Sequence, residues 1–275
     1  MTPEIEWQTA PEFDWYTASI PTGAQDVLDV LAGAYELSDI QPSTPKMGYE
    51  RAYSVVRGET VLARVQFGGS SVGTNVWACA TGEHAAEFAG IVRGSFPGHN
   101  LLRADVKLDY DEEGAWESLS ALAIETADRF KLKVEHHGDF HRAENGRTLN
   151  IGSRSSAAFE RIYEKGKQLG QSPNWVRAEL ELKPQNPKAK LLYASASPEA
   201  MYMATKWTRH LYEVLNGPSA AFRPAPAGTV RKKSDDDRAL EFMARQYGNV
   251  LRRRLEAMGG DIEAFGMYIA GLITN

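Results

Sequence analysis

Strict alternation between charged and apolar residues in three segments constrains the fold more than any other feature of this chain. In segment 101–110, every second residue is charged: Arg103, Asp105, Lys107 and Asp109. Successive side chains of a β-strand point to opposite faces, so the four charged residues share one face and the apolar residues share the other. The pattern predicts a strand that buries one face and presents charge on the other.

Two later segments repeat this pattern. In 174–183 the residues on one face are Arg177, Glu179 and Glu181, and in 158–165 they are Phe159, Arg161, Tyr163 and Lys165. If the three strands are neighbours, their charged sides form one floor of carboxylates, basic groups and a single phenol. Charged faces also occur on any solvent-exposed antiparallel sheet, where cross-strand ion pairs add modest stability, and alternation alone favours that simpler interpretation.

The rest of the chain predicts short strands and amphipathic helices. Further strands are expected at 49–56, 60–67, 74–80, 132–135 and 148–152, and helices at 23–37, 84–94, 112–130 and 197–215. The expected fold class is α+β, with an antiparallel sheet covered on one face by helices. The second half repeats the theme of the first in a different order, and a single continuous sheet containing both halves is one expected arrangement.

Composition and turn residues divide the chain into four parts. We expect an N-terminal arm with a helix at 1–45, a main domain at 46–216 made of halves 46–99 and 100–216, a Pro/Gly/Ala-rich linker at 217–234, and a C-terminal helical segment at 235–275. The last segment begins with acids and has Arg252–Arg254 near the end of its first helix, an order that complements the helix dipole.

Charge and cysteine content limit the classes of function. The net charge is −5, yet residues 129–190 hold thirteen Lys or Arg against seven Asp or Glu, a local balance of +6 that suits a phosphate-binding face. Cys79 is the only cysteine, which excludes an internal disulfide or a multi-thiolate zinc site. Without a signal pattern or a long apolar run, we expect a cytoplasmic protein that does not enter a membrane.

The charged floor has a direct chemical use. Carboxylates can hold Mg²⁺ or Mn²⁺ through oxygen ligands, and the cation then stabilises charge on a phosphoryl group. A tyrosine is a poor nucleophile at neutral pH, and nearby cations such as Lys165 and Arg161 would favour the phenolate. The adjacent histidines His136 and His137 lack metal-binding spacing and are interpreted as part of a polar loop, while Tyr202 and Tyr212 are expected in the core.

Four motifs, in order, go beyond alternation: RADVKLDY at 103–110, IGSRSS at 151–156, RIYEKG at 161–166 and WVRAELEL at 175–182. Together they resemble the Rep_trans family, the replication initiation factors of rolling-circle plasmids, filamentous phages and some integrative elements. The resemblance covers roughly residues 100–185. It implies a bacterial-host enzyme that recognises an origin, single-stranded or cruciform, and nicks one DNA strand through a 5′-phosphotyrosyl link.

The resemblance also implies roles for individual residues. Tyr163 would be the nucleophile, assisted by Arg161 and Lys165. The metal ligands would be Asp105 and Glu179, with Asp109 and Glu181 as further candidates, and the DNA contacts would be Arg103, Lys107, Arg154 and Arg177. A host helicase and a homodimer are implied partners. Two alternatives stay open: a DNA-binding regulator without catalysis, and a metal-dependent nuclease that uses water.

Overall fold

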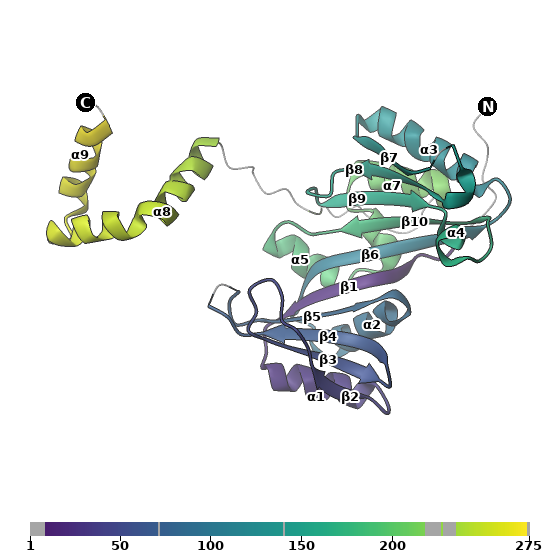
Figure 1. Ribbon diagram of the computed structural model, residues 1–275, viewed down its shortest axis with the longest axis horizontal. Coiled ribbons are helices and arrows are strands. Elements are labelled where there is room, and N and C mark those ends of the chain that lie inside the picture. Colours follow the sequence, from purple (N-terminus) through teal and green to yellow (C-terminus); the bar gives the residue numbers. More distant parts are fainter. Residues whose placement is uncertain (1–8, 71, 140, 218–226, 228–234, 274–275) are drawn as a thin grey trace. The chain divides into compact units, whose positions relative to one another are not determined.

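The computed structural model describes residues 9–70, 72–139, 141–217, 227 and 235–273. The chain divides into a first unit, 1–229, and a second unit, 230–275. The first unit contains the sheet and its covering helices (Figure 1). Most of the expected linker lies outside the described residues.

Ten strands form one antiparallel sheet in the order β2-β3-β4-β5-β1-β6-β10-β9-β8-β7. The strands of the first half are β1 (Glu12–Ile20), β2 (Asp39–Pro42), β3 (Arg51–Arg57), β4 (Thr60–Phe67) and β5 (Val76–Thr81). Those of the second half are β6 (Asn100–Asp111), β7 (Val134–Gly138), β8 (Arg147–Gly152), β9 (Ala158–Tyr163) and β10 (Trp175–Leu182). The predicted α+β class with an antiparallel sheet is confirmed, and the sheet is continuous.

The two halves have the same topology rather than a different order. Each begins with a strand and a helix, continues with four strands in a meander, and returns its last strand to pair with its first. The first strands, β1 and β6, pair with each other and join the halves. We therefore describe the first unit as two β-α-β-β-β-β halves that meet at the β1–β6 pair.

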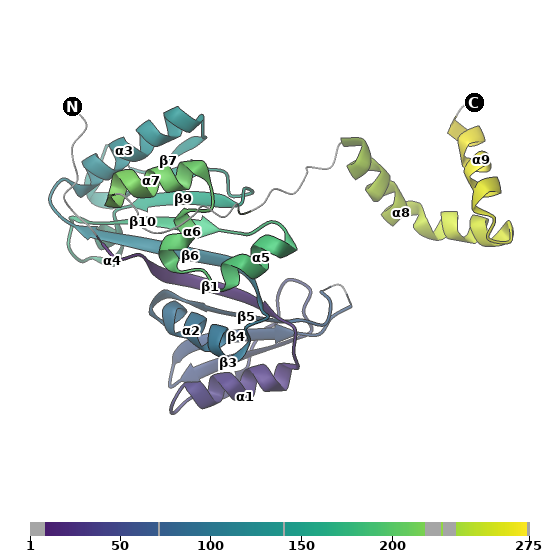
Figure 2. The same cartoon turned by 180° about the vertical axis from the view of Figure 1, so that it is seen from behind.

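Six helices cover one face of the sheet and leave the other face open (Figure 2). They are α1 (Ala24–Ala34), α2 (Ala85–Ser95), α3 (Ala115–Phe130), α5 (Pro187–Ala194), α6 (Pro198–Tyr202) and α7 (Lys206–Asn216). The core lies between these helices and the apolar side of the strands, where Phe88, Leu108 and Leu180 are fully buried. The expectation that Tyr202 and Tyr212 belong to the core is confirmed.

The segment expected as an N-terminal arm supplies a central strand. Residues 12–20 form β1, which lies between β5 and β6. Its pairing with β6 is shifted between Phe13 and Trp15 and again between Thr17 and Ala18. Such irregularities break the two-residue alternation on which strand prediction depends, because a bulge moves later side chains to the other face.

Two other expected elements have different boundaries. Lys165 does not continue β9 but begins α4 (Lys165–Leu169) in the connection to β10. The helix expected at 197–215 is divided into α6 and α7, because Thr205 and Thr208 form a capping box that starts a new helix at Lys206. The polar loop expected around His136 and His137 is instead partly strand, since both histidines lie on β7.

The second unit consists of two helices, α8 (Asp235–Ala257) and α9 (Ile262–Ile273). Gly259 and Gly260 have positive φ angles of 69° and 79°, which lets the chain turn between the helices. The Asp261 carboxylate caps α9 by accepting hydrogen bonds from the Glu263 and Ala264 backbone N–H groups. Among all described helices, none has the length and apolar character needed to cross a membrane.

Candidate active site on the open sheet face

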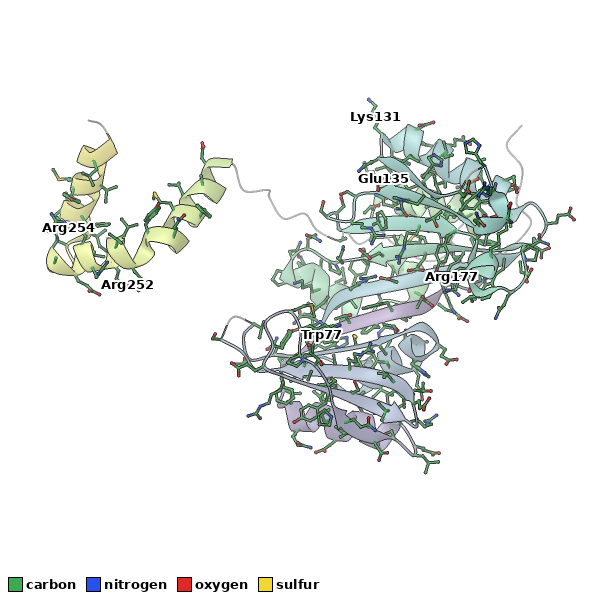
Figure 3. All side chains as sticks on the ribbon, in the orientation of Figure 1. Trp77, Lys131, Glu135, Arg177, Arg252 and Arg254 are labelled. Carbon is green, nitrogen blue, oxygen red and sulfur yellow. The ribbon has the colours of Figure 1, made fainter. Side chains whose placement is uncertain are left out.

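The three alternating segments are neighbouring strands, with β10 between β6 and β9. The register places Glu181 opposite Asp105 and Phe159, and Glu179 opposite Lys107 and Arg161. The charged sides of the strands therefore do form one floor, on the face that the helices leave open. In Figure 3, which views this face, Arg177 marks the second half and Trp77 the first half.

Tyr163 lies at the end of β9, directly opposite Arg177 on β10. Its hydroxyl donates a 2.8 Å hydrogen bond to Glu179 Oε2. Burial raises the pKa of the Tyr163 phenol well above its usual value, and the negative charge of Glu179 raises it further. In this arrangement the phenol stays protonated, and the carboxylate positioned to accept its proton is Glu179.

The two cations expected to favour a Tyr163 phenolate, Arg161 and Lys165, do not contact the phenolic oxygen. Arg161 directs its guanidinium to the Glu179 carboxylate, with which it forms a close ion pair. The Lys165 ammonium lies 5.7 Å from the centroid of the Tyr163 ring and donates to Gln168 Oε1. Arg161 thus offsets the charge of Glu179, and Lys165 contacts the ring face from α4 rather than from the strand.

Glu179 is also one of three carboxylates that form a buried cluster. Asp105, Glu179 and Glu181 are only 2%, 4% and 3% exposed. Arg103 binds Asp105 through Nε and Nη2 at 2.7 and 2.6 Å, and its Nη2 lies 2.9 Å from Glu181 Oε2. Arg161 Nη2 lies 3.5 Å from Asp105 Oδ2, so guanidinium groups connect all three acids.

Burial raises the pKa of Asp105 to about 7, an effect that the bonded Arg103 opposes and that Glu179 and Glu181 reinforce. Asp105 directly faces Glu181 across the β6–β10 pair. Like charges this close in a buried site disfavour full ionisation. Arg103, Arg161 and Lys183 nevertheless pair with the three acids, so burial rather than unpaired negative charge is the main cause of the raised pKa of Asp105.

Asp109 belongs to a separate cluster. It accepts bonds from Arg177 Nε and Nη2 at 2.7 and 2.8 Å and from Trp175 Nε1 at 2.8 Å. Arg177 also reaches Asp14 at 3.0 Å, and the Lys107 ammonium lies 3.9 Å from Asp109. Of the four predicted metal ligands, the structure brings three together and places Asp109 with the Arg177 side chain instead.

The three clustered acids fit a hard divalent cation in their chemistry, since carboxylate oxygens are the ligands that Mg²⁺ and Mn²⁺ prefer. A bound cation would compete there with Arg103, Arg161 and Lys183, which already pair with the three acids. Within the described ranges, no three His, Cys, Asp or Glu side chains already surround a common point as metal ligands. Arg103 and Arg161 occupy the space between the carboxylates.

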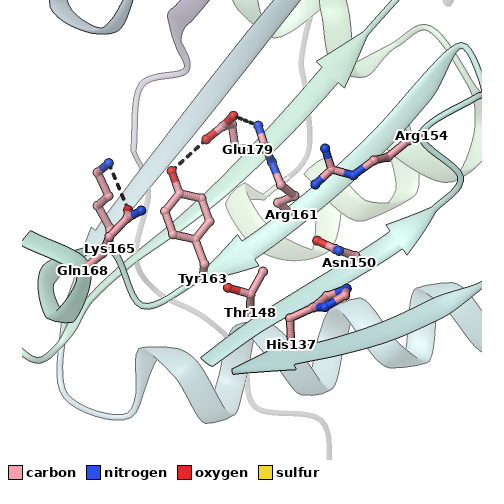
Figure 4. Close-up of a pocket in the computed structure, with 9 residues that line it drawn as sticks. All are labelled: His137, Thr148, Asn150, Arg154, Arg161, Tyr163, Lys165, Gln168 and Glu179. Atoms are coloured by element: carbon pink, nitrogen blue, oxygen red, sulfur yellow. Dashed lines mark hydrogen bonds and ion pairs between the residues drawn. The ribbon is translucent and has the colours of Figure 1, made fainter. Parts of the chain in front are cut away.

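A cavity of about 460 Å³ opens beside Tyr163 (Figure 4). Its walls contain five of the predicted residues: Arg154, Arg161, Tyr163 and Glu179 from the sheet and its connections, and Lys165 from α4. The guanidinium of Arg154 lies 5.0 Å from the centroid of the Phe159 ring. The remaining lining residues, which sequence reasoning missed, are His137, Thr148, Asn150 and Gln168.

A signal for two of these missed residues was present in the sequence. Thr148 and Asn150 alternate with the buried Leu149 and Ile151, so they share the open face of β8. The register places Thr148 opposite Tyr163 and Asn150 opposite Arg161. Neutral polar residues in an alternating strand are ordinary surface residues, and only the pairing with β9 gives them a place in the cavity.

The sequence model of one family, the replication initiation factors, matches residues 117–269. The match includes Arg154, Tyr163 and β10, extends through α8 and ends within α9. It begins after β6, so the strand with Asp105 lies outside it.

A solved structure, that of the rolling circle replication initiator protein from Geobacillus stearothermophilus, is similar in fold. The two superpose with a TM-score of 0.53 at 20% sequence identity, covering 70% of this chain and 82% of that chain. No curated protein matches the chain. The resemblance inferred from the four motifs is therefore supported by both a sequence match and a shared fold.

Proposed function

This chain belongs to the replication initiation factor family, and from that premise we propose that it is a rolling-circle initiator that nicks one DNA strand through Tyr163. The observation that carries the proposal is the hydrogen bond from the Tyr163 hydroxyl to Glu179 at the edge of an open, cation-lined cavity. It pairs a potential nucleophile with a proton acceptor on an accessible face of the sheet, as covalent catalysis requires.

The proposed step transfers a phosphoryl group from DNA to the enzyme. Glu179 accepts the phenolic proton, and Tyr163 Oη forms a bond to phosphorus. The bond from phosphorus to the 3′-oxygen breaks, and that oxygen takes a proton from solvent. The strand then remains attached through its 5′-phosphate, and the free 3′-OH can prime synthesis.

The high pKa of Tyr163 makes proton removal the costly part of this step. A base within hydrogen-bonding distance lowers that cost because the proton moves as the new bond forms. Bound DNA would also bring a phosphate next to Arg161, whose guanidinium now lies against Glu179. A shift of Arg161 toward the phosphate would free Glu179 for the phenolic proton and stabilise charge on the phosphoryl oxygens.

We assign Mg²⁺ or Mn²⁺ to the Asp105, Glu179 and Glu181 cluster, where Asp105 and Glu181 face each other across two strands. When bound, such a cation would polarise the phosphate and offset the charge that develops on it. Arg103, which now bridges Asp105 and Glu181, would have to release one of them. We do not include Asp109 in this set, because it belongs to the separate cluster with Arg177 and Trp175.

The basic residues around the cavity support binding of a phosphate backbone. Arg154 and Lys165 lie on the cavity wall. Among the described residues, no carboxylate forms an ion pair with either of these two cations. Arg103 and Arg177, predicted as DNA contacts, instead hold carboxylates in place. The host helicase and the homodimer remain predictions from the family resemblance.

The proposal can be tested with a labelled single-stranded oligonucleotide from the origin, Mn²⁺ and a denaturing gel. We expect a covalent protein–DNA adduct that is absent in Tyr163→Phe and retained in Tyr247→Phe, a control at an exposed tyrosine of α8. Glu179→Gln should slow adduct formation and Asp105→Asn should weaken its dependence on Mn²⁺. Cleavage without an adduct would instead indicate a water-using nuclease, and binding without cleavage a regulator.

A further inference from the structure

Asn150 combines burial with an unmet hydrogen-bonding capacity. The residue is 4% exposed, and its side-chain Oδ1 has no hydrogen-bond partner. It lies on the open face of β8 and lines the cavity beside Tyr163. A buried polar atom without a partner is destabilising, so its presence in the cavity wall points to a ligand that completes the bond.

A second unpartnered atom lies directly across the strand pair. Asn150 faces Arg161 in the β8–β9 register, and Arg161 Nε is buried and also lacks a partner. The two groups offer an acceptor and a donor at neighbouring positions in one cavity. Figure 4 shows Asn150 next to Arg161, with Arg154 further along the same side and the Tyr163 phenol toward the other end.

The cavity is large enough, at about 460 Å³, for a small ligand of the size that protein pockets commonly hold. Its polar lining is neutral near Thr148 and Asn150 and cationic at Arg154 and Lys165. A nucleotide has the same division, with hydrogen-bonding base edges that are neutral and a phosphate that is anionic. Unpaired bases are read by hydrogen bonds to their edges, in pockets next to the backbone contacts.

On this basis, and resting on the proposed nicking function, we infer that the cavity is a nucleobase subsite in which Asn150 reads a base beside the phosphate that Tyr163 attacks. The unpartnered acceptor on Asn150 is complementary to an exocyclic amino group, which adenine, cytosine and guanine have, whereas the only base-edge donor of thymine is its ring N3–H. Arg154 holds the neighbouring phosphate. The subsite thus makes Asn150 a specificity-determining residue for the position of the nick.

The experiment compares oligonucleotides that differ only in the base at each position flanking the cut. With the wild-type chain, we expect adduct formation at one adjacent position to be about tenfold slower for thymine than for the preferred amino-bearing base. In Asn150→Leu this preference should fall to about twofold or less at that position and persist at the others. Asn174→Leu, at an exposed asparagine outside the cavity, should keep the full preference.

Thermal unfolding separates base reading from a structural role. Removing a buried, unpartnered polar atom in favour of an apolar side chain of similar size should leave Tm unchanged or raise it. A lower Tm in Asn150→Leu, with the base preference intact in Asn150→Ser, would show that the asparagine serves the fold alone. Equal slowing of all four bases in Asn150→Leu would also overturn the subsite.

A binding measurement distinguishes failure of this inference from failure of the nicking proposal. Fluorescence anisotropy of the same oligonucleotides with the full-length Tyr163→Phe chain should show the same preference and its loss in the Asn150→Leu, Tyr163→Phe double variant. If the wild type forms no adduct but this preference persists, nicking is wrong and base reading stands. If adducts form but substitution of Asn150 never alters base preference in rate or binding, the subsite is wrong.

Discussion

The two halves of the sheet have the same strand topology but different chemistry on the open face. Strands β3, β4 and β5 contain no Asp or Glu, whereas β10 alone supplies Glu179 and Glu181. The last open-face residue of β4 is Gln66, and the last residue of β9 is Tyr163. The topology therefore provides two similar platforms, and only the second has a cluster of acids with a phenol beside it.

The connections between strands also make the open faces of the two halves different. In the first half, Gln66 is buried and accepts a 2.7 Å hydrogen bond from the Lys46 backbone N–H, so the β2–β3 connection closes over this position. In the second half, the corresponding position next to Tyr163 is an open cavity. The β3–β4 turn is only Gly58 and Glu59, while the β8–β9 connection is longer and contributes Arg154. One platform is sealed by its own loop, and the other is left accessible.

The largest expected effect is on stability and compares Arg103→Gln in the second half with Arg64→Gln in the first. Arg103 is the bridge between Asp105 and Glu181, so its loss leaves buried Asp105 with only the 3.5 Å contact to Arg161 and Glu181 with only Lys183. We expect Arg103→Gln to lower the free energy of unfolding at pH 8 by about 2 kcal/mol. Arg64 is exposed, and its substitution should change stability by less than about 0.5 kcal/mol.

Urea unfolding of both variants at several pH values checks this difference. Because protonated Asp105 no longer repels Glu181, the loss in Arg103→Gln should shrink as the pH falls below 7. Similar losses for Arg64→Gln and Arg103→Gln would mean that the acid cluster does not distinguish the two halves energetically.

The next prediction concerns the pH dependence that Asp105 gives to the second half. Its folded-state pKa of about 7 exceeds the ordinary value of 3.8, so between these values the folded chain holds a proton that the unfolded chain has released. The free energy of unfolding should therefore fall as pH rises through this window, by up to about 1.4 kcal/mol per pH unit from this group. In Asp105→Asn the decline should be shallower.

Urea titrations of wild type and Asp105→Asn between pH 4 and 8 provide the measurement, with Cm and m recorded for each. A matched control is Asp111→Asn at the exposed end of β6, which should keep the wild-type decline. Identical pH profiles for wild type and Asp105→Asn would place the titration elsewhere in the cluster.

Sequence alternation was sufficient to predict the charged floor, because β6, β9 and β10 are regular strands whose buried faces specify their register. It was insufficient for β1, where two register shifts disturb the pattern, and this hid the common topology of the halves. Alternation also could not predict which side chains bond to one another. That Glu179 accepts a hydrogen bond from Tyr163 while Asp109 accepts bonds from Arg177 depends on the register between strands far apart in the chain.

The same limit applies to the cavity. The sequence predicted that Lys165 lies near Tyr163 because both would belong to one strand. Lys165 does lie near Tyr163, but on α4. Alternation places Asn150 on the open face of β8, but its significance comes from burial and from an unpartnered oxygen, and neither can be deduced from residue type. The proposed function depends on which side chains are left without hydrogen-bond partners by the pairing of strands far apart in the chain. A local sequence pattern does not contain that information.

The smallest expected effect on stability compares Arg154→Gln in the β8–β9 connection with Arg57→Gln next to the β3–β4 turn. Both side chains are exposed, so each variant should stay within about 0.5 kcal/mol of the wild-type stability.

Arg154 lines the cavity, and its loss should remove one phosphate contact. We expect oligonucleotide binding to weaken about tenfold at low salt, and the slope of log K against log salt to fall by about 0.7 for a single strand. Arg57 donates to the Glu36 carbonyl in the first half, and Arg57→Gln should leave both quantities unchanged. Anisotropy titrations across a salt series decide the matter: equal losses in the two variants would mean that the strand follows both platforms, whereas a loss confined to Arg154→Gln would place it on the second alone.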